Sequence, residues 1–249
     1  MKVSTSVATP STRSMRARDK LMHTAERLYA EHGFANVSIR MIREAAGQRN
    51  KSAVQYHFST RDELIQAILA RHAAAIDEHR LPMVAALEAS GEVSLRDWIT
   101  CAIAPSIEHH IELGTPSWYG RFLAQAVVEP TLREYADQAH RGTPSFRRLE
   151  RLRPSRGRDH DRELSARHAT MIRLLIVHMS AELEADLAAG RVDGRVDGRV
   201  DGRVDGRVDG RVDGRVDTAG AEQAWRRLGE NLITAVCGLS SALLETSAS

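Results

Sequence analysis

The chain has 249 residues and a net charge of +2; 42% of its residues are hydrophobic and only 4% are aromatic. This length allows a small domain and a larger one, and the sequence lacks the uncharged apolar run of about 18 residues that a membrane helix needs. The two cysteines, Cys101 and Cys237, lie far apart, which excludes a disulfide framework and predicts a protein of the reducing cytoplasm.

Motifs for catalysis are also missing from the sequence. It contains no Gly-x-Ser-x-Gly, no His-Glu-x-x-His and no glycine-rich phosphate loop. We therefore expect a binding protein rather than an enzyme, with no bound cofactor.

Charge is divided unevenly along the chain. Residues 1–61 hold eleven Lys and Arg against four acidic residues, a net charge of +7, whereas the remaining residues carry −5. A basic end on an acidic body is expected when one end of a protein faces the phosphates of a nucleic acid. Residues 1–14 are rich in Ser and Thr and lack the apolar segment of a signal peptide, so we expect a disordered basic arm there.

Residues 15–61 predict three short helices around a glycine turn. The first is expected from Met15 to His32, with Gly33 as its stop, and the second from the N-cap residue Ser38 to Gly47. The third is expected over the range 51–57. A short helix, a turn and a second helix with polar side chains form a helix-turn-helix, whose second helix enters the DNA major groove.

An ordered set of residues marks this segment, namely Ala25, Phe34, Val37-Ser38-Ile39, Ile42, Ala46-Gly47, Gln55-Tyr56-His57-Phe58, Arg61 and Glu63-Leu64. With this set, the stretch from Arg16 to Ala70 resembles the N-terminal DNA-binding domain of the TetR family of bacterial transcriptional regulators. The resemblance covers a little over a fifth of the chain, and it implies double-stranded DNA as a partner.

Side chains that can reach base edges are grouped at the start of the third predicted helix: Arg49, Asn50, Lys51, Ser52 and Gln55. Asn and Gln pair bidentately with adenine, and Arg and Lys with guanine. The resemblance implies phosphate contacts from Tyr56, Lys51 and Arg61. Ser38 and Arg40, at the N-terminus of the second helix, are candidates for the same role because the helix dipole favours an anion there.

The remaining residues, 62–249, are predicted to be helical, which makes the expected fold class all-α. Capping boxes at 60–63 and 94–97 open helices that should end at Pro82 and near Leu113. Further helices are predicted over 83–90, 118–139 with a kink at Pro130, 146–152, 163–188 and 221–245. The fourth helix should join the head to this helical effector-binding and dimerisation domain. The resemblance implies that the last two long helices of each subunit pair into a dimeric four-helix bundle.

Seven Arg-Val-Asp triplets, separated by single glycines, fill residues 191–217. A glycine at every fourth position costs about 1 kcal/mol each in a helix, so we expect a disordered insertion. An exact repeat is typical of the expansion of a short DNA unit rather than of a selected site.

Bulky or soft side chains at inward positions of the body helices are candidates to line an effector pocket: Trp98, Cys101, Ile103, Trp118, Tyr119, Phe122 and Met171. Each of them also fits an ordinary core position. Four histidines, His72, His109, His110 and His178, are candidates to orient a polar group of a ligand, but their spacing predicts no metal site.

The function expected is that of a ligand-responsive repressor. A twofold dimer places two recognition helices about 34 Å apart, one turn of DNA, and requires a palindromic operator. A ligand would act by changing that spacing. The alternative is a helical dimeric interaction or scaffold protein without specific DNA binding, against which the basic surface of the head argues.

Overall fold

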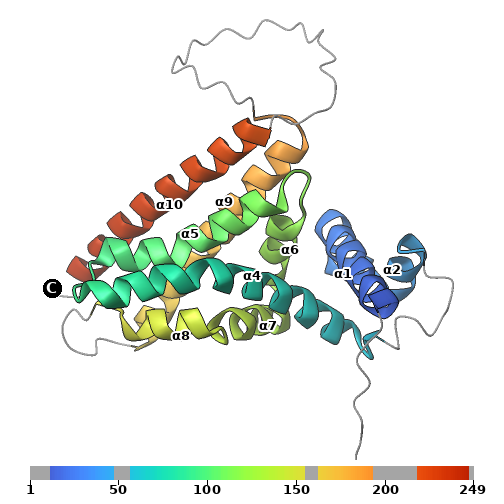
Figure 1. The fold of residues 1–249 in the computed structure, drawn as a ribbon, viewed down its shortest axis with the longest axis horizontal. Coiled ribbons are helices and arrows are strands. Elements are labelled where there is room, and N and C mark those ends of the chain that lie inside the picture. Colours follow the sequence, from blue (N-terminus) through green and yellow to red (C-terminus); the bar gives the residue numbers. More distant parts are fainter. Residues whose placement is uncertain (1–11, 48–56, 155–161, 193–217, 247–249) are drawn as a thin grey trace, which may run out of the picture.

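The computed structural model describes residues 12–47, 57–154, 162–192 and 218–246. Within these four ranges all regular elements are helices, which confirms the predicted all-α class. The N-terminal head contains α1 (Thr12–His32), the short 3-10 helix η1 (Phe34–Asn36) and α2 (Ile39–Ala45). From the head, α4 (Arg61–Ser90) leads into the body (Figure 1).

The helix ends in the head follow the predicted capping residues. Gly33, with φ of 81°, ends α1, and Gly47, with φ of 67°, ends α2, since both adopt a backbone conformation that favours glycine. Ser38 caps α2, where its Oγ accepts a hydrogen bond from the amide of Met41 at 3.3 Å. The first helix begins at Thr12, three residues inside the predicted basic arm, and the rest of that arm lies outside the described residues.

The length of α4 corrects the prediction that the fourth helix ends at Pro82, because the expected helix over 83–90 is the C-terminal part of α4. A proline inside a helix leaves the carbonyl four residues earlier, that of Glu78, without its amide partner. Both residues are exposed, so water can hydrate this carbonyl. Beyond the proline, Val84 and Leu87 are buried against α5 and α8, and this packing holds the last turns.

The next helices show how a proline can begin a helix instead of kinking one. The predicted capping box at Ser94 is confirmed and opens α5 (Leu95–Leu113). The single helix expected over 118–139 is wrong: α6 (Tyr119–Ala126) ends before α7 (Pro130–Arg141) begins. Glu129 caps α7 by accepting a hydrogen bond from the amide of Leu132 at 2.7 Å. Pro130 is the first residue of α7, where its missing N–H costs nothing.

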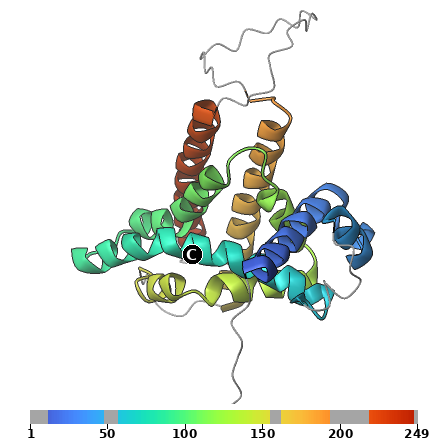
Figure 2. The same cartoon turned by 45° about the vertical axis from the view of Figure 1, so that its right-hand side comes forward.

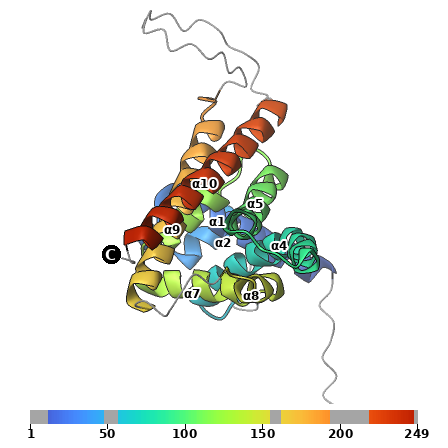
Figure 3. The ribbon, with the colours of Figure 1, turned by 90° about the vertical axis from the view of Figure 1, so that its left-hand side faces the viewer.

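After α8 (Pro144–Arg151), two long helices close the body. They are α9 (Arg162–Ala188) and α10 (Thr218–Thr246), each starting within three residues of its predicted position. The two run beside each other along one side of the body, with α4 and α5 on the other side (Figure 3). The repeat tract is described only at Arg191 and Val192; its remainder, and its predicted disorder, lie outside the described residues.

The largest apolar core is shared by the head and the body. It joins Leu21, Tyr29 and Ile42 of the head with Phe122 of α6 and Leu132 of α7. Figure 2 brings the head forward and shows α1 and α2 beside the N-terminal end of α4. A second core lies between α5, α9 and α10. No described helix combines the length and the apolar character that crossing a membrane requires.

Candidate nucleic-acid interface

The outward face of α2 carries two of the predicted phosphate-binding residues. Ser38 is exposed and caps the helix. The side chain of Arg40 is 78% exposed, and its Nε lies 2.8 Å from Oε1 of Glu44. Because an exposed ion pair of this kind contributes at most about 1 kcal/mol, a phosphate can replace the carboxylate as the partner of Arg40.

The side chain of Arg61, also predicted to bind phosphate, instead makes contacts within the head. Its Nη2 donates a hydrogen bond to the carbonyl oxygen of Phe34 at 2.6 Å. The guanidinium also lies over the rings of Tyr29 and Phe34, at 5.6 and 5.9 Å from their centroids. These contacts fix the start of α4 against η1, a bracing role that the sequence pattern did not reveal.

The predicted reading residues of the third helix, Arg49, Asn50, Lys51, Ser52, Gln55 and Tyr56, lie outside the described residues. The chain on either side of this segment is held by the head. Phe58 is buried in the core, and the guanidinium of Arg18 lies 4.9 Å above its ring. Before the segment, a Cβ on Gly47 would stand 3.7 Å from Nζ of Lys20. Two cations of α1 thus flank the ends of the segment.

The predicted pocket residues are distributed over different parts of the body. Trp98 donates a hydrogen bond to the carbonyl of Leu149 at 2.9 Å, and Cys101 is buried in the core between α4, α5 and α8, whereas Ile103 is buried in the core between α5, α9 and α10. Trp118, Tyr119 and Phe122 follow one another at the start of α6. Met171 is 42% exposed on α9. The structure therefore groups the three α6 residues, whereas Trp98, Cys101 and Ile103 pack in the cores around α5 and Met171 is exposed.

Three of the four candidate histidines meet around Tyr119. His72 stacks on the Tyr119 ring at a centroid distance of 3.9 Å, and its Nδ1 lies 2.8 Å from Nε2 of His109. His110 lies 5.3 Å from the same ring and stacks on Trp225 of α10 at 4.2 Å. Burial, followed by the charge of neighbouring groups, lowers the pKa of His109 and of His110 to about 3. Both are therefore neutral near pH 7. The fourth, His178, is exposed on α9.

A buried carboxylate of α1 connects this group of rings to the head. Glu26 is only 4% exposed, and its Oε2 accepts hydrogen bonds from Arg71 and from Nε2 of His72, the latter at 3.1 Å. Burial acts to raise the pKa of Glu26, but the hydrogen bond and charge of His72 and the charge of Arg71 outweigh it and lower the pKa. In the described part of the chain, no three His, Cys, Asp or Glu side chains are arranged to hold a metal ion.

A second buried carboxylate, Glu184 of α9, holds the start of α6. It accepts hydrogen bonds from Ser117 Oγ at 2.8 Å, the amide of Gly120 at 2.9 Å, and the amide and Nε of Arg121 at 3.0 and 3.1 Å. A Cβ on Gly120 would stand 3.2 Å from backbone atoms of α9, so glycine allows this close approach.

Sequence reasoning missed Glu26 and Glu184, although a signal was present. Glu26 shares the inner face of α1 with Met22 and Tyr29, and Glu184 shares a face of α9 with Val177 and Leu187. An acidic residue at a helical position otherwise filled by core residues is a sign of a buried polar contact.

The start of α6 is in turn tied to the head. Phe122 lies 5.3 Å from the ring of Phe34 and 6.3 Å from that of Tyr29. Gln125 Nε2 donates a hydrogen bond to the carbonyl oxygen of Ala30, the third-last residue of α1, at 3.1 Å. A displacement of α6 would therefore move α1.

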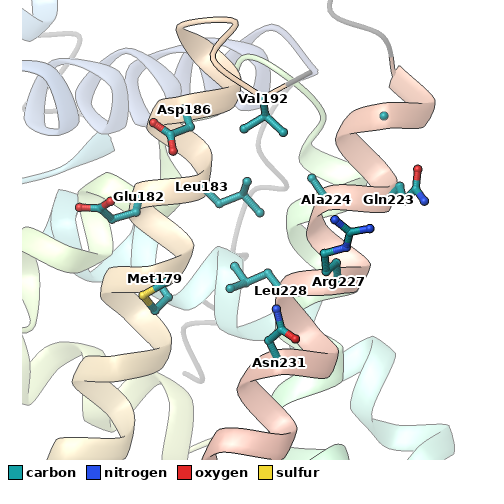
Figure 4. Close-up of a pocket in the computed structure, with 11 residues that line it drawn as sticks. Met179, Glu182, Leu183, Asp186, Val192, Gln223, Ala224, Arg227, Leu228 and Asn231 are labelled. Atoms are coloured by element: carbon teal, nitrogen blue, oxygen red, sulfur yellow. The ribbon is translucent and has the colours of Figure 1, made fainter. Parts of the chain in front are cut away.

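A groove of about 310 Å³ lies between the end of α9 and the start of α10 (Figure 4). Leu183, Val192 and Leu228 point into it from the two sides, and Glu182, Asp186 and Arg227 give it charged edges. In the sequence, the repeat tract is inserted between these two helices. None of the predicted pocket residues lines it.

Comparison with known proteins agrees with the helix-turn-helix that the sequence predicts in the head. Residues 21–68 match the family model described as "Bacterial regulatory proteins, tetR family". A curated relative, the "HTH-type transcriptional repressor AcnR" of Corynebacterium efficiens, is 32% identical over 73 residues. These residues are 29% of this chain and 38% of the relative, so the similarity spans well under half of either protein.

Proposed function

Because residues 21–68 place this chain in the TetR family of bacterial regulatory proteins, we propose that it is a sequence-specific DNA-binding transcriptional regulator. The match over these residues is the observation that carries the proposal. The repressor named among the similar proteins favours repression as the mode of action. Binding rather than catalysis is then the activity of the chain.

The basic surface of the head supports this proposal. Arg16, Arg18, Lys20 and Arg40 are exposed on α1 and α2 and would face the phosphates, together with the helix dipole at Ser38. The third helix would supply the base contacts, with Gln55 and Asn50 as the first candidates and Arg49, Lys51 and Ser52 beside them. Tyr56 would add a phosphate contact.

We propose that the regulator is a homodimer that pairs through α9 and α10. Met171 and Met179 are each 42% exposed on α9, and the groove between the two helices has apolar walls. Exposed apolar side chains gathered on one face are typical of a protein interface. Two heads related by a twofold axis would bind a palindromic operator with half-sites about 34 Å apart.

We also propose that a small-molecule effector changes the distance between the two heads. Trp118, Tyr119 and Phe122 begin α6, and Phe122 with Gln125 holds α1. An effector that displaced α6 would therefore move the head and reduce its fit to the operator.

Selection of bound fragments from genomic DNA with the purified protein tests the proposal. We expect enrichment of a palindrome. Gln55→Ala should relax the sequence preference, whereas Lys51→Ala should weaken binding to all DNA and reduce the slope of log affinity against log salt by about one.

Arg96→Ala provides a matched control, because Arg96 is an exposed cation at the start of α5, outside the head and outside the proposed dimer helices. This variant should keep both the palindrome and the salt slope. Failure to enrich any palindrome, with a folded dimer in hand, would instead favour the helical scaffold protein.

A further inference from the structure

Arg80 of α4 is a buried cation enclosed between α4, α5 and α8. It is 0% exposed, and its guanidinium lies over the ring of Phe146 on α8, 5.7 Å from the ring centroid. Nε donates a hydrogen bond to the carbonyl oxygen of Cys101 at 3.1 Å, whereas Nη1 makes only a long contact of 3.5 Å with Oγ of Ser145. Nη2 is buried without a partner in the described part of the chain. The edge of the guanidinium formed by Nη1 and Nη2 is therefore almost unused.

The positive charge of Arg80 is balanced only indirectly by the nearest carboxylate of α4. This is Asp77, one turn earlier, whose Oδ1 accepts hydrogen bonds from the amide of Ser145 at 2.9 Å and from the hydroxyl of the same residue. Burial lowers the pKa of Arg80 to about 10 and the charge of Asp77 acts against this shift, so the side chain is a cation near pH 7. An anion that reached Nη2 would satisfy a buried donor and supply a direct counter-charge.

The surroundings of Arg80 favour an anion with a single charge. His140 of α7, whose ring lies 4.4 Å from that of Phe146, is neutral near pH 7, because burial, followed by the charge of Arg80, lowers its pKa to about 3. It therefore adds no positive charge, while Asp77 repels a second negative one. A carboxylate carries one charge, and its two oxygens match two nitrogens of an arginine in bidentate geometry. This chemistry fits the unused edge better than a phosphate dianion does.

Phe146 marks the side from which a ligand can reach the guanidinium. Ser145 and Cys101, which accept from Arg80, are buried, whereas Phe146 and its neighbour His140 are partly exposed. Rotation of the Phe146 side chain would uncover Nη1 and Nη2. The space that its ring leaves would then accommodate an apolar or aromatic group next to the carboxylate.

The same place borders the start of α6. Burial raises the pKa of the Tyr119 hydroxyl, and the charge of Arg80 acts against this shift, so the two side chains lie close enough to interact. Tyr119 and Cys101, two of the predicted pocket residues, thus both lie near Arg80. Since α6 is packed against the head through Phe122, a ligand that presses on Tyr119 would displace α6 and with it α1.

We propose that Arg80 binds the carboxylate of the effector, and that the effector is a small monocarboxylate with an apolar or aromatic body. The two carboxylate oxygens accept hydrogen bonds from Nη1 and Nη2, and the body of the ligand takes the place of the Phe146 ring beside Tyr119. This inference rests on the proposed ligand response of the regulator. Its binding step, however, can be measured without DNA.

Calorimetric titration of the full chain at constant ionic strength tests the binding step, with benzoate and butyrate as probes and benzamide as the neutral analogue of benzoate. At least one of the two carboxylates should bind at concentrations up to about 10 mM, at which a site of millimolar affinity is largely occupied. Benzamide should bind at least about tenfold more weakly than benzoate, because it lacks the charge that strengthens the hydrogen bonds to Arg80.

Substitutions locate the binding. Arg80→Met keeps an unbranched side chain and leaves both hydrogen bonds between Ser145 and Asp77 in place, and it should weaken carboxylate binding at least about tenfold. Arg80→Lys, which keeps the charge but not the bidentate edge, should weaken it severalfold and decides the question if Arg80→Met fails to fold. Phe146→Ala should bind more tightly than the wild type, because no ring has to be displaced.

Arg147→Gln is the matched control. Arg147 follows Phe146 on α8 but is exposed, so this variant removes one positive charge next to the site without touching Arg80. It should bind carboxylates as the wild type does. Failure of both carboxylates to bind, equal affinity for benzoate in the wild type and the Arg80 variants, or no gain in affinity for Phe146→Ala would overturn the inference.

DNA binding tests whether the site belongs to the effector. A carboxylate that binds should lower the affinity of the wild type for its enriched duplex and leave that of Arg80→Met unchanged. A bound carboxylate without this effect would refute the effector role of the site. If no duplex is enriched, the proposed DNA-binding function fails, while the titrations still decide whether Arg80 binds a carboxylate.

Discussion

Glu184 allows the attachment of α6 to α9 to be measured as a free energy. Its carboxylate accepts four hydrogen bonds at the start of α6, two at Oε1 from Ser117 and Gly120 and two at Oε2 from Arg121. In Glu184→Gln, one oxygen remains for the first pair, and the amide nitrogen that replaces the other oxygen faces two donors. The variant therefore loses two bonds and leaves Arg121 without its counter-charge.

The expected cost follows from the strength of such bonds. Hydrogen bonds to a charged group contribute about 1.5 to 3 kcal/mol each, and removing one member of a buried ion pair costs about 3 to 5 kcal/mol. Since the side chain of Arg121 is a quarter exposed, solvent compensates part of its charge. We expect the unfolding free energy to fall by about 3 kcal/mol.

Urea unfolding at a fixed protein concentration measures this change, because dimerisation makes stability depend on concentration. Glu134→Gln, at an exposed position of α7 outside the proposed dimer helices, is the control and should change the unfolding free energy by less than about 0.5 kcal/mol. A loss below about 1 kcal/mol for Glu184→Gln would refute the idea that this carboxylate anchors α6.

Three other measurements test the cores, the buried histidines and the repeat. Phe122→Ala, which removes a fully buried ring between head and body, should lower the unfolding free energy by about 3 to 5 kcal/mol in the same urea assay, whereas exposed Val128→Ala should have little effect. Burial lowers the folded-state pKa of His109 and of His110 to about 3, so below pH 6.5 the unfolded chain binds more protons than the folded one. The unfolding free energy should therefore decrease as the pH is lowered below 6.5, by up to about 1.4 kcal/mol per pH unit for each histidine. Equal unfolding midpoints at pH 7.5 and 5.5 would contradict this. Deletion of residues 194–213, five repeat units, should leave DNA affinity unchanged and shift the melting temperature by no more than a few degrees, because loop closure depends weakly on length; loss of DNA binding would reveal a role for the repeat.

The sequence predicted those parts of the fold that depend on local chemistry. Ser38, Ser94 and Gly33 set helix ends by hydrogen bonds and backbone conformation within a few residues, so their signals could be recognised without tertiary information. The two errors concern prolines. Whether Pro82 ends a helix depends on the packing of Val84 and Leu87 beyond it, and Pro130 begins α7 because Glu129 caps the helix.

The first repeat unit shows how a local signal can also explain where the tract begins. Gly190, with φ of 65°, ends α9, and Arg191 returns to Asp186 through its backbone amide at 2.9 Å and its guanidinium at 2.7 Å. Val192 packs against the core between α5, α9 and α10. Gly-Arg-Val is thus a helix stop at this first position. The same three residues recur in every later unit, where α9 has already ended and this role is no longer available.

The polar contacts between helices were beyond sequence reasoning for a different reason. Glu26 finds Arg71 and His72 on α4, His72 finds His109 on α5, and Ser117 finds Glu184 on α9. The partners are separated by between 37 and 67 residues, and nothing local to either partner identifies the other. What the sequence does show is a charged or polar side chain at a helical position that is otherwise filled by core residues. Since an unpaired buried charge would destabilise the fold by several kcal/mol, each such side chain requires a partner. Glu26 of α1 and His72 of α4 both occupy core positions, and each supplies the hydrogen-bond partner of the other.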